Sequence, residues 1–216
     1  MIKIKTQDEI KKMKVASSII SDLLFHLEDK YIKPGINTLE LDKVAENYII
    51  EKGAIPGFKG LYGFPATLCI SINDEVVHGI PSKRKLKDGD IVGIDVGAIY
   101  EGYYGDHAKT FPIGNVNKSI LKLMEVTKEC LKIGINKAIP GNRIGDIGFA
   151  IQTYAEEYGF GVVRELVGHG IGEKLHEEPQ IPNFGTPNMG PLIEKGMCFA
   201  IVPMINFGTK DVYTKD

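Results

Sequence analysis

Apolar residues recur at helical spacing in four segments of the chain. Residues 6–9 (Thr-Gln-Asp-Glu) form a capping-box pattern, and apolar positions then repeat every three or four residues until Pro34-Gly35 stops them. The same spacing predicts a second helix over residues 38–53. Two later segments, residues 119–138 and residues 144–158, repeat this arrangement and predict two more amphipathic helices.

Each pair of predicted helices is followed by a stretch rich in strand-forming residues. Residues 67–72, 90–98 and 103–111 predict three strands, and the last two form a hairpin. A second such stretch covers residues 161–167 and 197–206. No linker of low complexity separates the two repeats. The order helix, helix, strands therefore predicts one α+β domain built from two related halves.

Two aspartates eleven positions apart lie within the predicted hairpin. A two-residue turn at residues 100–101 would place Asp95 directly opposite Asp106, and a turn at residues 101–102 would place them diagonally on the same face. Like charges facing each other across a strand pair are destabilising unless a cation lies between them. Aspartates near turns often only cap them, but this pair lies several residues away and Asp95 interrupts an apolar strand. The pair predicts a metal site.

Three histidines are candidates for the same site. His169 has glycine on both sides, which suits close approach of the backbone to a ligand better than core packing. His78 lies between a predicted strand and a turn, and His176 follows His169 by seven residues. Taken singly, His78 and His176 could equally be ordinary structural histidines.

Other residues do not fit this site, for physical reasons. His26 falls inside the first predicted helix, and His107 adjoins Asp106, so strand alternation sends its side chain to the opposite face. Glu177 and Glu178, which follow His176, are interpreted as a solvated loop. The glycine run at residues 168–172 is not a dinucleotide-binding motif, and the chain has no P-loop, GxSxG or HExxH pattern.

Composition limits the kind of partner. The chain has 216 residues, enough for one sizeable core, and a formal net charge of −2, which does not favour nucleic acid or an anionic membrane. Its three cysteines are widely spaced without a CxxC motif, as expected for reduced thiols. No apolar run approaches membrane-spanning length. We therefore expect a soluble, cytoplasmic protein. We also expect a monomer.

Three spaced segments resemble a known family. They are residues 71–81 (SINDEVVHGIP), residues 90–111, and residues 168–179 (GHGIGEKLHEEP). In order and spacing they resemble the bacterial type I methionine aminopeptidases, from about residue 3 to the end of the chain. The resemblance implies the pita-bread (creatinase/aminopeptidase-like) α+β fold, with two pseudo-twofold-related halves around an antiparallel sheet. It implies a single domain over residues 1–216 that lacks the family's C-terminal strand segment.

The resemblance also assigns roles to residues. Enzymes of this family remove the initiator methionine from new polypeptides, with two metal ions held by two aspartates, one histidine and two glutamates. Carried over to this chain, Asp95 chelates one ion, Asp106 bridges both and His169 binds the other. His78 and His176 contact the substrate and help to stabilise the tetrahedral intermediate.

The remaining implications concern the substrate pocket, the metal and the partners. Cys69 and Phe64 match positions that line the methionine pocket, while Leu61 stands where an aromatic residue is common. The metal would be a divalent ion of the Co, Mn, Fe, Zn or Ni class, with up to two ions in the family and fewer here. The partner would be a peptide or nascent-chain N-terminus, which implies proximity to the ribosome without direct nucleic-acid or membrane binding.

The chain departs from the family pattern at two of the five ligands. The family reads Phe-x-Ile-Glu-Pro-Met where this chain has Phe199-Ala-Ile-Val202-Pro-Met204. Valine can act neither as a ligand nor as a general base, and loss of a general acid or base alone costs about 10²–10⁴ in rate. The second glutamate is expected beyond Asp216, where the chain stops. The sequence thus predicts weak or absent aminopeptidase activity.

Two alternatives remain open at this point. One is a non-catalytic pita-bread protein whose pocket binds a peptide or partner without hydrolysis, which the valine at position 202 would fit. The other is a proline-specific peptidase of the same fold, although such enzymes carry an additional N-terminal domain. We do not expect a neighbouring acid such as Glu194 to replace the missing glutamates.

Overall fold

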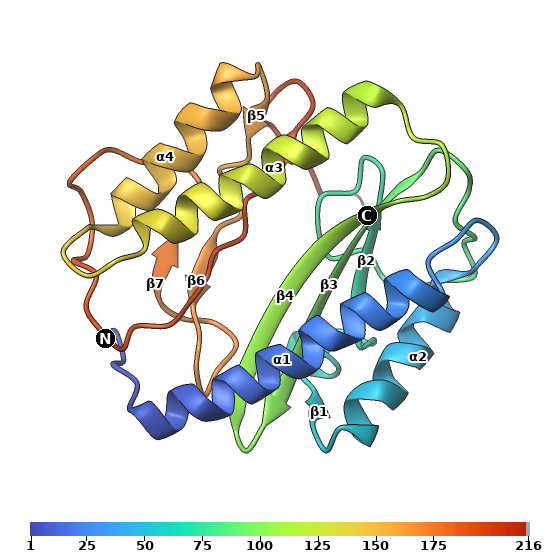
Figure 1. Ribbon diagram of the computed structural model, residues 1–216, viewed down its shortest axis with the longest axis horizontal. Coiled ribbons are helices and arrows are strands. Elements are labelled where there is room, and N and C mark those ends of the chain that lie inside the picture. Colours follow the sequence, from blue (N-terminus) through green and yellow to red (C-terminus); the bar gives the residue numbers. More distant parts are fainter. Residues whose placement is uncertain (215–216) are drawn as a thin grey trace. The chain divides into compact units, whose positions relative to one another are not determined.

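The computed structural model describes residues 1–214, and its elements are shown in Figure 1. In chain order they are α1 (Gln7–Lys30), α2 (Thr38–Glu51), β1 (Ile55–Pro56), the short 3-10 helix η1 (Leu61–Gly63), β2 (Leu68–Ile72), β3 (Ile91–Tyr100), β4 (Tyr103–Pro112), α3 (Lys118–Lys137), α4 (Ile144–Glu157), β5 (Gly161–Val162), β6 (Gly168–Gly170), β7 (Glu177–Ile181), β8 (Phe199–Ala200) and β9 (Ile205–Asn206). The four helices predicted from apolar spacing are confirmed within a few residues at each end.

The chain divides into two compact units. We call residues Gln7–Asn117 and Gly172–Leu175 the N-terminal unit. Residues Met1–Thr6, Lys118–Ile171 and the segment from His176 onward form the C-terminal unit. The prediction that the whole chain is a single domain stays a prediction, and each unit is described by itself below.

A four-stranded antiparallel sheet forms the centre of the N-terminal unit. Strand β3 is central: β4 pairs with one of its edges, and β2 and β1 pair along the other. The hairpin joins β3 to β4 through Glu101 and Gly102, both with positive φ (47° and 84°), as a type I′ turn requires. The three strands predicted in this part of the sequence are confirmed.

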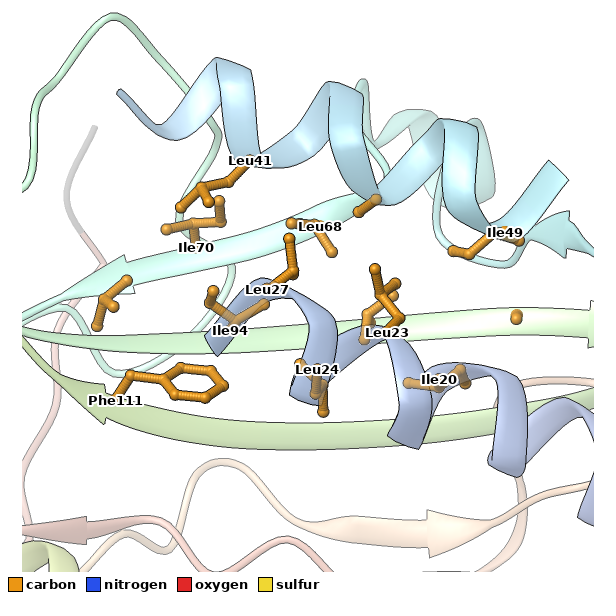
Figure 2. Close-up of a cluster of buried hydrophobic side chains, with 14 of the residues drawn as sticks. Ile20, Leu23, Leu24, Leu27, Leu41, Ile49, Leu68, Ile70, Ile94 and Phe111 are labelled. Carbon is orange, nitrogen blue, oxygen red and sulfur yellow. The ribbon is translucent and has the colours of Figure 1, made fainter. Parts of the chain in front are cut away.

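The core of this unit lies between the sheet and its two helices. Figure 2 shows Leu23 and Leu27 of α1, together with Leu41 of α2, packed against Leu68 and Ile94 of the sheet. Successive residues of a strand point to opposite faces. Since the even-numbered residues of β3 from 92 to 98 join this core, the odd-numbered ones face away from the helices.

A half-buried carboxylate connects α2 to the start of β2. Oδ1 of Asp42 accepts hydrogen bonds from the backbone N–H groups of Thr67 (2.9 Å) and Leu68 (2.8 Å). Burial raises the pKa of Asp42 above its ordinary value, because removing the ionised carboxylate from water is unfavourable. The folded chain therefore holds this proton more tightly than the unfolded chain does.

This shift predicts a pH dependence of stability. When the folded-state pKa of an acid is raised, the free energy of unfolding falls as pH rises from the unfolded value of about 4 through the folded value. Asp42→Asn keeps the accepting oxygen and removes the charge, so we expect its stability relative to wild type to increase over this range. Denaturant unfolding at several pH values measures the difference. Parallel curves for the two proteins would rule out a titrating Asp42.

The C-terminal unit packs two helices over short strands. Its core consists of apolar residues of α3 and α4 together with residues of the strands and loops: Val126, Cys130, Ile144, Ile147, Ile151, Ala155, Val162, Ile181 and Ile193. A three-stranded antiparallel sheet has the order β7-β6-β8, and β5 pairs with β9. In Figure 1, α3 and α4 run side by side over this unit.

Strand predictions were less accurate in this unit. Of the predicted strand 161–167 only Gly161–Val162 is strand. The predicted strand 197–206 is interrupted between β8 and β9, where Pro203 has no N–H to donate to a ladder. Strands β6 and β7 were not predicted, and the residues 177 and 178 that begin β7 were interpreted as a loop. Among residues 1–214 no helix is long and apolar enough to cross a membrane.

Candidate active site

The hairpin register decides between the two predicted arrangements of the aspartates. Tyr100 pairs with Tyr103, so Asp95 lies opposite Ala108 and Asp106 lies opposite Gly97. This is the diagonal arrangement, with both aspartates on the sheet face that points away from the helices. Both residues are half-buried. The predicted convergence of two carboxyl groups is therefore present within the N-terminal unit.

The electrostatics of this pair favour a cation. Burial raises the pKa of Asp95 well above its ordinary range, and the negative charge of Asp106 and a hydrogen bond between the two side chains raise it further. A hydrogen bond between two carboxyl groups needs a proton, since carboxylate oxygens only accept. A bound divalent ion would take the place of that proton and offset both charges.

Cys69 lies beside the aspartates on the same face. It pairs with Asp95 across β2 and β3, and its side chain is buried. Burial, followed by the charges of Asp95, Asp106 and Asp42, raises the pKa of the thiol to about 12. A neutral thiol is a soft, apolar surface rather than a strong metal ligand. This environment suits the pocket-lining role that the resemblance gave to Cys69.

His78 and Phe64 lie at either end of β2. Phe64 is half-buried and follows η1, four residues before the strand begins. His78 is exposed and has a left-handed backbone (φ 61°), which is uncommon for a residue other than glycine. After it, the chain folds back along β2: the N–H of Ile70 donates to the carbonyl of Gly79 (2.8 Å). A side chain at Gly79 would collide with that strand.

In the C-terminal unit, His169 and His176 are in contact. Their ring centroids are 4.5 Å apart, and the rings meet edge to face at 77°. Nδ1 of His169 lies 2.9 Å from the carbonyl oxygen of Gly170, which can only accept, so this nitrogen carries the proton. The lone pair of the neutral ring is then on Nε2, as a metal-binding histidine requires.

The two glycines beside His169 are required by its position in the middle strand of a sheet. A Cβ on Gly168 would collide with the carbonyl oxygen of Ala200, and one on Gly170 would collide with that of Glu178. The glycines were expected to let the backbone approach a ligand. The close approach seen in the structure is to the backbone of neighbouring strands in the same sheet.

Gly170→Ala should be markedly destabilising for this reason. We expect a loss of about 1–3 kcal/mol in the free energy of unfolding, because neither backbone can move away without breaking the sheet. Gly93→Ala is the matched control, since a Cβ at this β3 position meets nothing closer than 3.7 Å. Denaturant melts of both variants test the prediction, and equal losses would contradict it.

The backbone of Val202, where the chain departs from the family pattern, is fixed by a hydrogen bond. The carbonyl oxygen of Val202 accepts a hydrogen bond from Nδ2 of the fully buried Asn183 (2.7 Å), and Val202 is half-buried. Two residues later, the carbonyl of Met204 accepts from the N–H of Val163 (3.0 Å). The backbone is thus fixed at position 202 and two residues after it, while the side chain at position 202 is apolar.

The interpretation of Glu177 as part of a solvated loop was wrong. Its side chain is buried and lies 2.7 Å from Nζ of Lys5, which is also buried. Glu178 is exposed as expected. The two residues alternate because they belong to a strand, β7, whose presence the sequence did not indicate. Lys5 was not singled out either, because nothing around it in the sequence distinguishes it from a surface lysine.

Neither unit by itself forms a complete metal site. Within the described residues 1–214, no group of three or more His, Cys, Asp or Glu side chains is arranged to hold an ion. The N-terminal unit holds the aspartate pair with Cys69, and the C-terminal unit holds the histidine pair.

Comparison with known proteins identifies the family. The sequence profile of the family described as "Metallopeptidase family M24" matches residues 11–214. Methionine aminopeptidase 1 of Bacillus subtilis is 53% identical over 215 residues, which cover 99% of this chain and 86% of the relative. Methionine aminopeptidase of Clostridium perfringens is 50% identical over 216 residues, with 100% and 86% covered.

A solved structure agrees. The methionine aminopeptidase of Thermotoga maritima superposes with a TM-score of 0.97 at 44% identity, covering 100% of this chain and 87% of that one. This match confirms the expected α+β, pita-bread fold. The chain therefore belongs to metallopeptidase family M24 and, within it, to the bacterial type I methionine aminopeptidases.

Proposed function

We propose that this chain binds the N-terminal methionine of peptides or nascent chains at a metal site of Asp95, Asp106 and His169, and that hydrolysis there is weak or absent. The similarity to proteins named methionine aminopeptidase supports the substrate class, and membership of a metallopeptidase family supports a divalent metal. The observation that carries the second part is Val202, an apolar residue on a backbone fixed by Asn183.

The ligands that remain fit a divalent ion. Asp95 and Asp106 present two half-buried carboxyl groups whose mutual repulsion a cation would remove, and His169 directs a lone pair through Nε2. The proposal that the three bind one metal centre is supported by the family's ligand set. Bound divalent ions supply Lewis acidity and lower the pKa of water. An ion of the Co, Mn, Fe, Zn or Ni class is proposed, with fewer than two bound.

The substrate would be held by the chain's own side chains. Cys69, neutral at its raised pKa, and the half-buried ring of Phe64 offer a soft surface for the thioether of methionine. His78 and His176, both exposed, would donate N–H groups to the substrate carbonyl oxygen as negative charge develops on it. These roles come from the residue-by-residue match to the family.

The hydrolytic step should fail for want of a base. A carboxylate at position 202 would accept a proton from the attacking water, and the valine side chain has no atom that can do so. Losing such a group costs about 10²–10⁴ in rate. A non-catalytic peptide-binding protein of the same fold is the second candidate function, and the same valine favours it.

One pair of measurements tests the proposal. Release of methionine from Met-Ala-Ser is assayed with added Mn²⁺ or Co²⁺, and binding of the same peptide is measured by calorimetry. We expect binding that depends on the metal, with little turnover. Turnover comparable to that of the Bacillus subtilis relative would overturn the impaired-site proposal. Absence of both binding and turnover would argue against a functional pocket altogether.

The proposal extends to where the chain works. Nascent chains are the source of N-terminal methionine, so we infer that this protein meets them near the ribosome, in the cytoplasm. We also propose that it acts as a monomer. Co-sedimentation with translating ribosomes, compared with vacant ones, tests this inference. Equal amounts in the two pellets would contradict recruitment by the nascent chain.

A further inference from the structure

A buried ion pair links the start of the chain to the strand that follows His176. Nζ of Lys5 lies 2.7 Å from Oε2 of Glu177, and the two side chains are only 4% and 6% exposed. Nζ also donates to the carbonyl oxygen of Lys3 (3.3 Å). Removing two charges from water is unfavourable, so such a pair persists only with good geometry and further hydrogen bonds.

The backbone of Lys5 makes a second attachment. Its N–H donates to the carbonyl of Gly196 (2.8 Å). Gly196 has a φ of 96°, and a Cβ on it would lie 2.7 Å from the side chain of Ile4, so glycine is needed for this approach. Three residues later the chain enters β8, which pairs with β6 opposite Gly170.

Lys5 therefore contacts the chain next to both strands that flank β6, the strand that carries His169. Its side chain holds Glu177, at the start of β7, and its backbone holds Gly196, just before β8. Strands β7 and β8 are the two neighbours of β6. The N-terminal residues Met1–Thr6 belong to the same unit as these strands, and in Figure 1 the N-terminus lies on the side of β7.

The position of His176 needs such a link because the ladder beside it is irregular. His169 pairs with Gln180, but the next residue, Gly170, pairs with Glu177, so the register shifts between them. A regular ladder would fix each residue by its neighbours, and a bulge removes that constraint locally. Glu177 directly follows His176, so whatever fixes Glu177 also fixes the backbone from which His176 reaches His169.

We propose that Lys5 is a positioning residue, which holds His176 against His169 through the buried ion pair with Glu177. The N-terminal segment Met1–Thr6 is then part of the substrate-contacting apparatus, although it supplies no group to the reaction. This proposal rests on the proposed function only in giving His176 a substrate to contact. The placement of the ring is independent of it.

The test observes the histidine rings directly in metal-free protein. With ¹³C-labelled histidine, NMR resolves the Cε1–Hε1 signals of His169 and His176 at one fixed pH. His26, in the N-terminal unit, is the internal reference. We expect Lys5→Met to shift both signals without moving that of His26, and Lys5→Arg to restore them. Lys132→Met, which breaks the exposed pair with Glu129 in the same unit, should change neither.

A double variant covers the case in which Lys5→Met fails to fold. Lys5→Met with Glu177→Met replaces the ion pair by apolar chains of similar length, an exchange that is often neutral or stabilising. We expect it to fold with displaced His169 and His176 signals. Wild-type signals in either methionine variant, or no rescue by arginine, would overturn the proposal. The experiment needs neither metal nor turnover. Its result can therefore be interpreted even if the proposed aminopeptidase function is wrong.

Discussion

Replacing Val202 with glutamate should raise methionine release from Met-Ala-Ser by about 10²–10⁴-fold in the presence of Mn²⁺ or Co²⁺. The substitution returns a carboxylate that can accept a proton and bind an ion. It is the largest change in activity that we expect from a single substitution, since the other family positions in the described chain are filled: Asp95, Asp106, His169, His78 and His176.

The structure suggests that this position will accept the new side chain. Val202 is only half-buried, so a carboxylate there keeps part of its hydration and avoids the full cost of burial. Its carbonyl is held by Asn183, and the carbonyl of Met204 by Val163, through backbone atoms that the substitution leaves unchanged. The backbone geometry should therefore survive.

Val202→Gln is the matched control. It has nearly the shape of glutamate but no charge and no useful basicity, so a gain shared by both variants would reflect packing and would contradict the assigned role. If Val202→Glu does not release methionine, the aminopeptidase interpretation of this site is wrong.

The arrangement of the aspartate pair could be predicted almost completely from the sequence. A period of two and a two-residue turn left only two registers, and both brought the carboxyl groups to one face. The turn observed at Glu101-Gly102 has glycine second, where type I′ turns favour it. Sequence could therefore have selected the diagonal register as well, because the interactions that decide it are local.

The surroundings of His176 could not be predicted from the sequence. Glu177 and Glu178 look alike in the sequence, yet the side chain of Glu177 is buried and Glu178 is exposed. The difference depends on Lys5, which lies 172 positions away, and on a strand with a shifted register. A two- or three-residue strand such as β6 or β8 has too few positions for alternation to be recognised. Pairing partners distant in sequence decide these elements.

Asp95→Asn should reverse the order of stability between metal-free and metal-loaded protein. Without metal, the variant removes one of two facing acids and should unfold at a higher denaturant concentration at pH 7 than wild type does, because burial and Asp106 oppose ionisation of Asp95. With Mn²⁺ or Co²⁺, wild type should gain stability and the variant should not. At a free ion concentration 100 times the dissociation constant, the gain is about 2.7 kcal/mol.

The reversal is what makes this experiment decisive for the metal site. A substitution that merely damages packing lowers stability in both conditions, and one that merely relieves repulsion raises it in both. Only a residue that destabilises the metal-free protein and stabilises the metal-bound protein changes the order of stability. Asp22→Asn, at an exposed position of α1, should follow wild type in both conditions. An Asp95→Asn variant that still gains stability from the ion would show that the ion binds elsewhere, and the aspartate pair would then need another explanation.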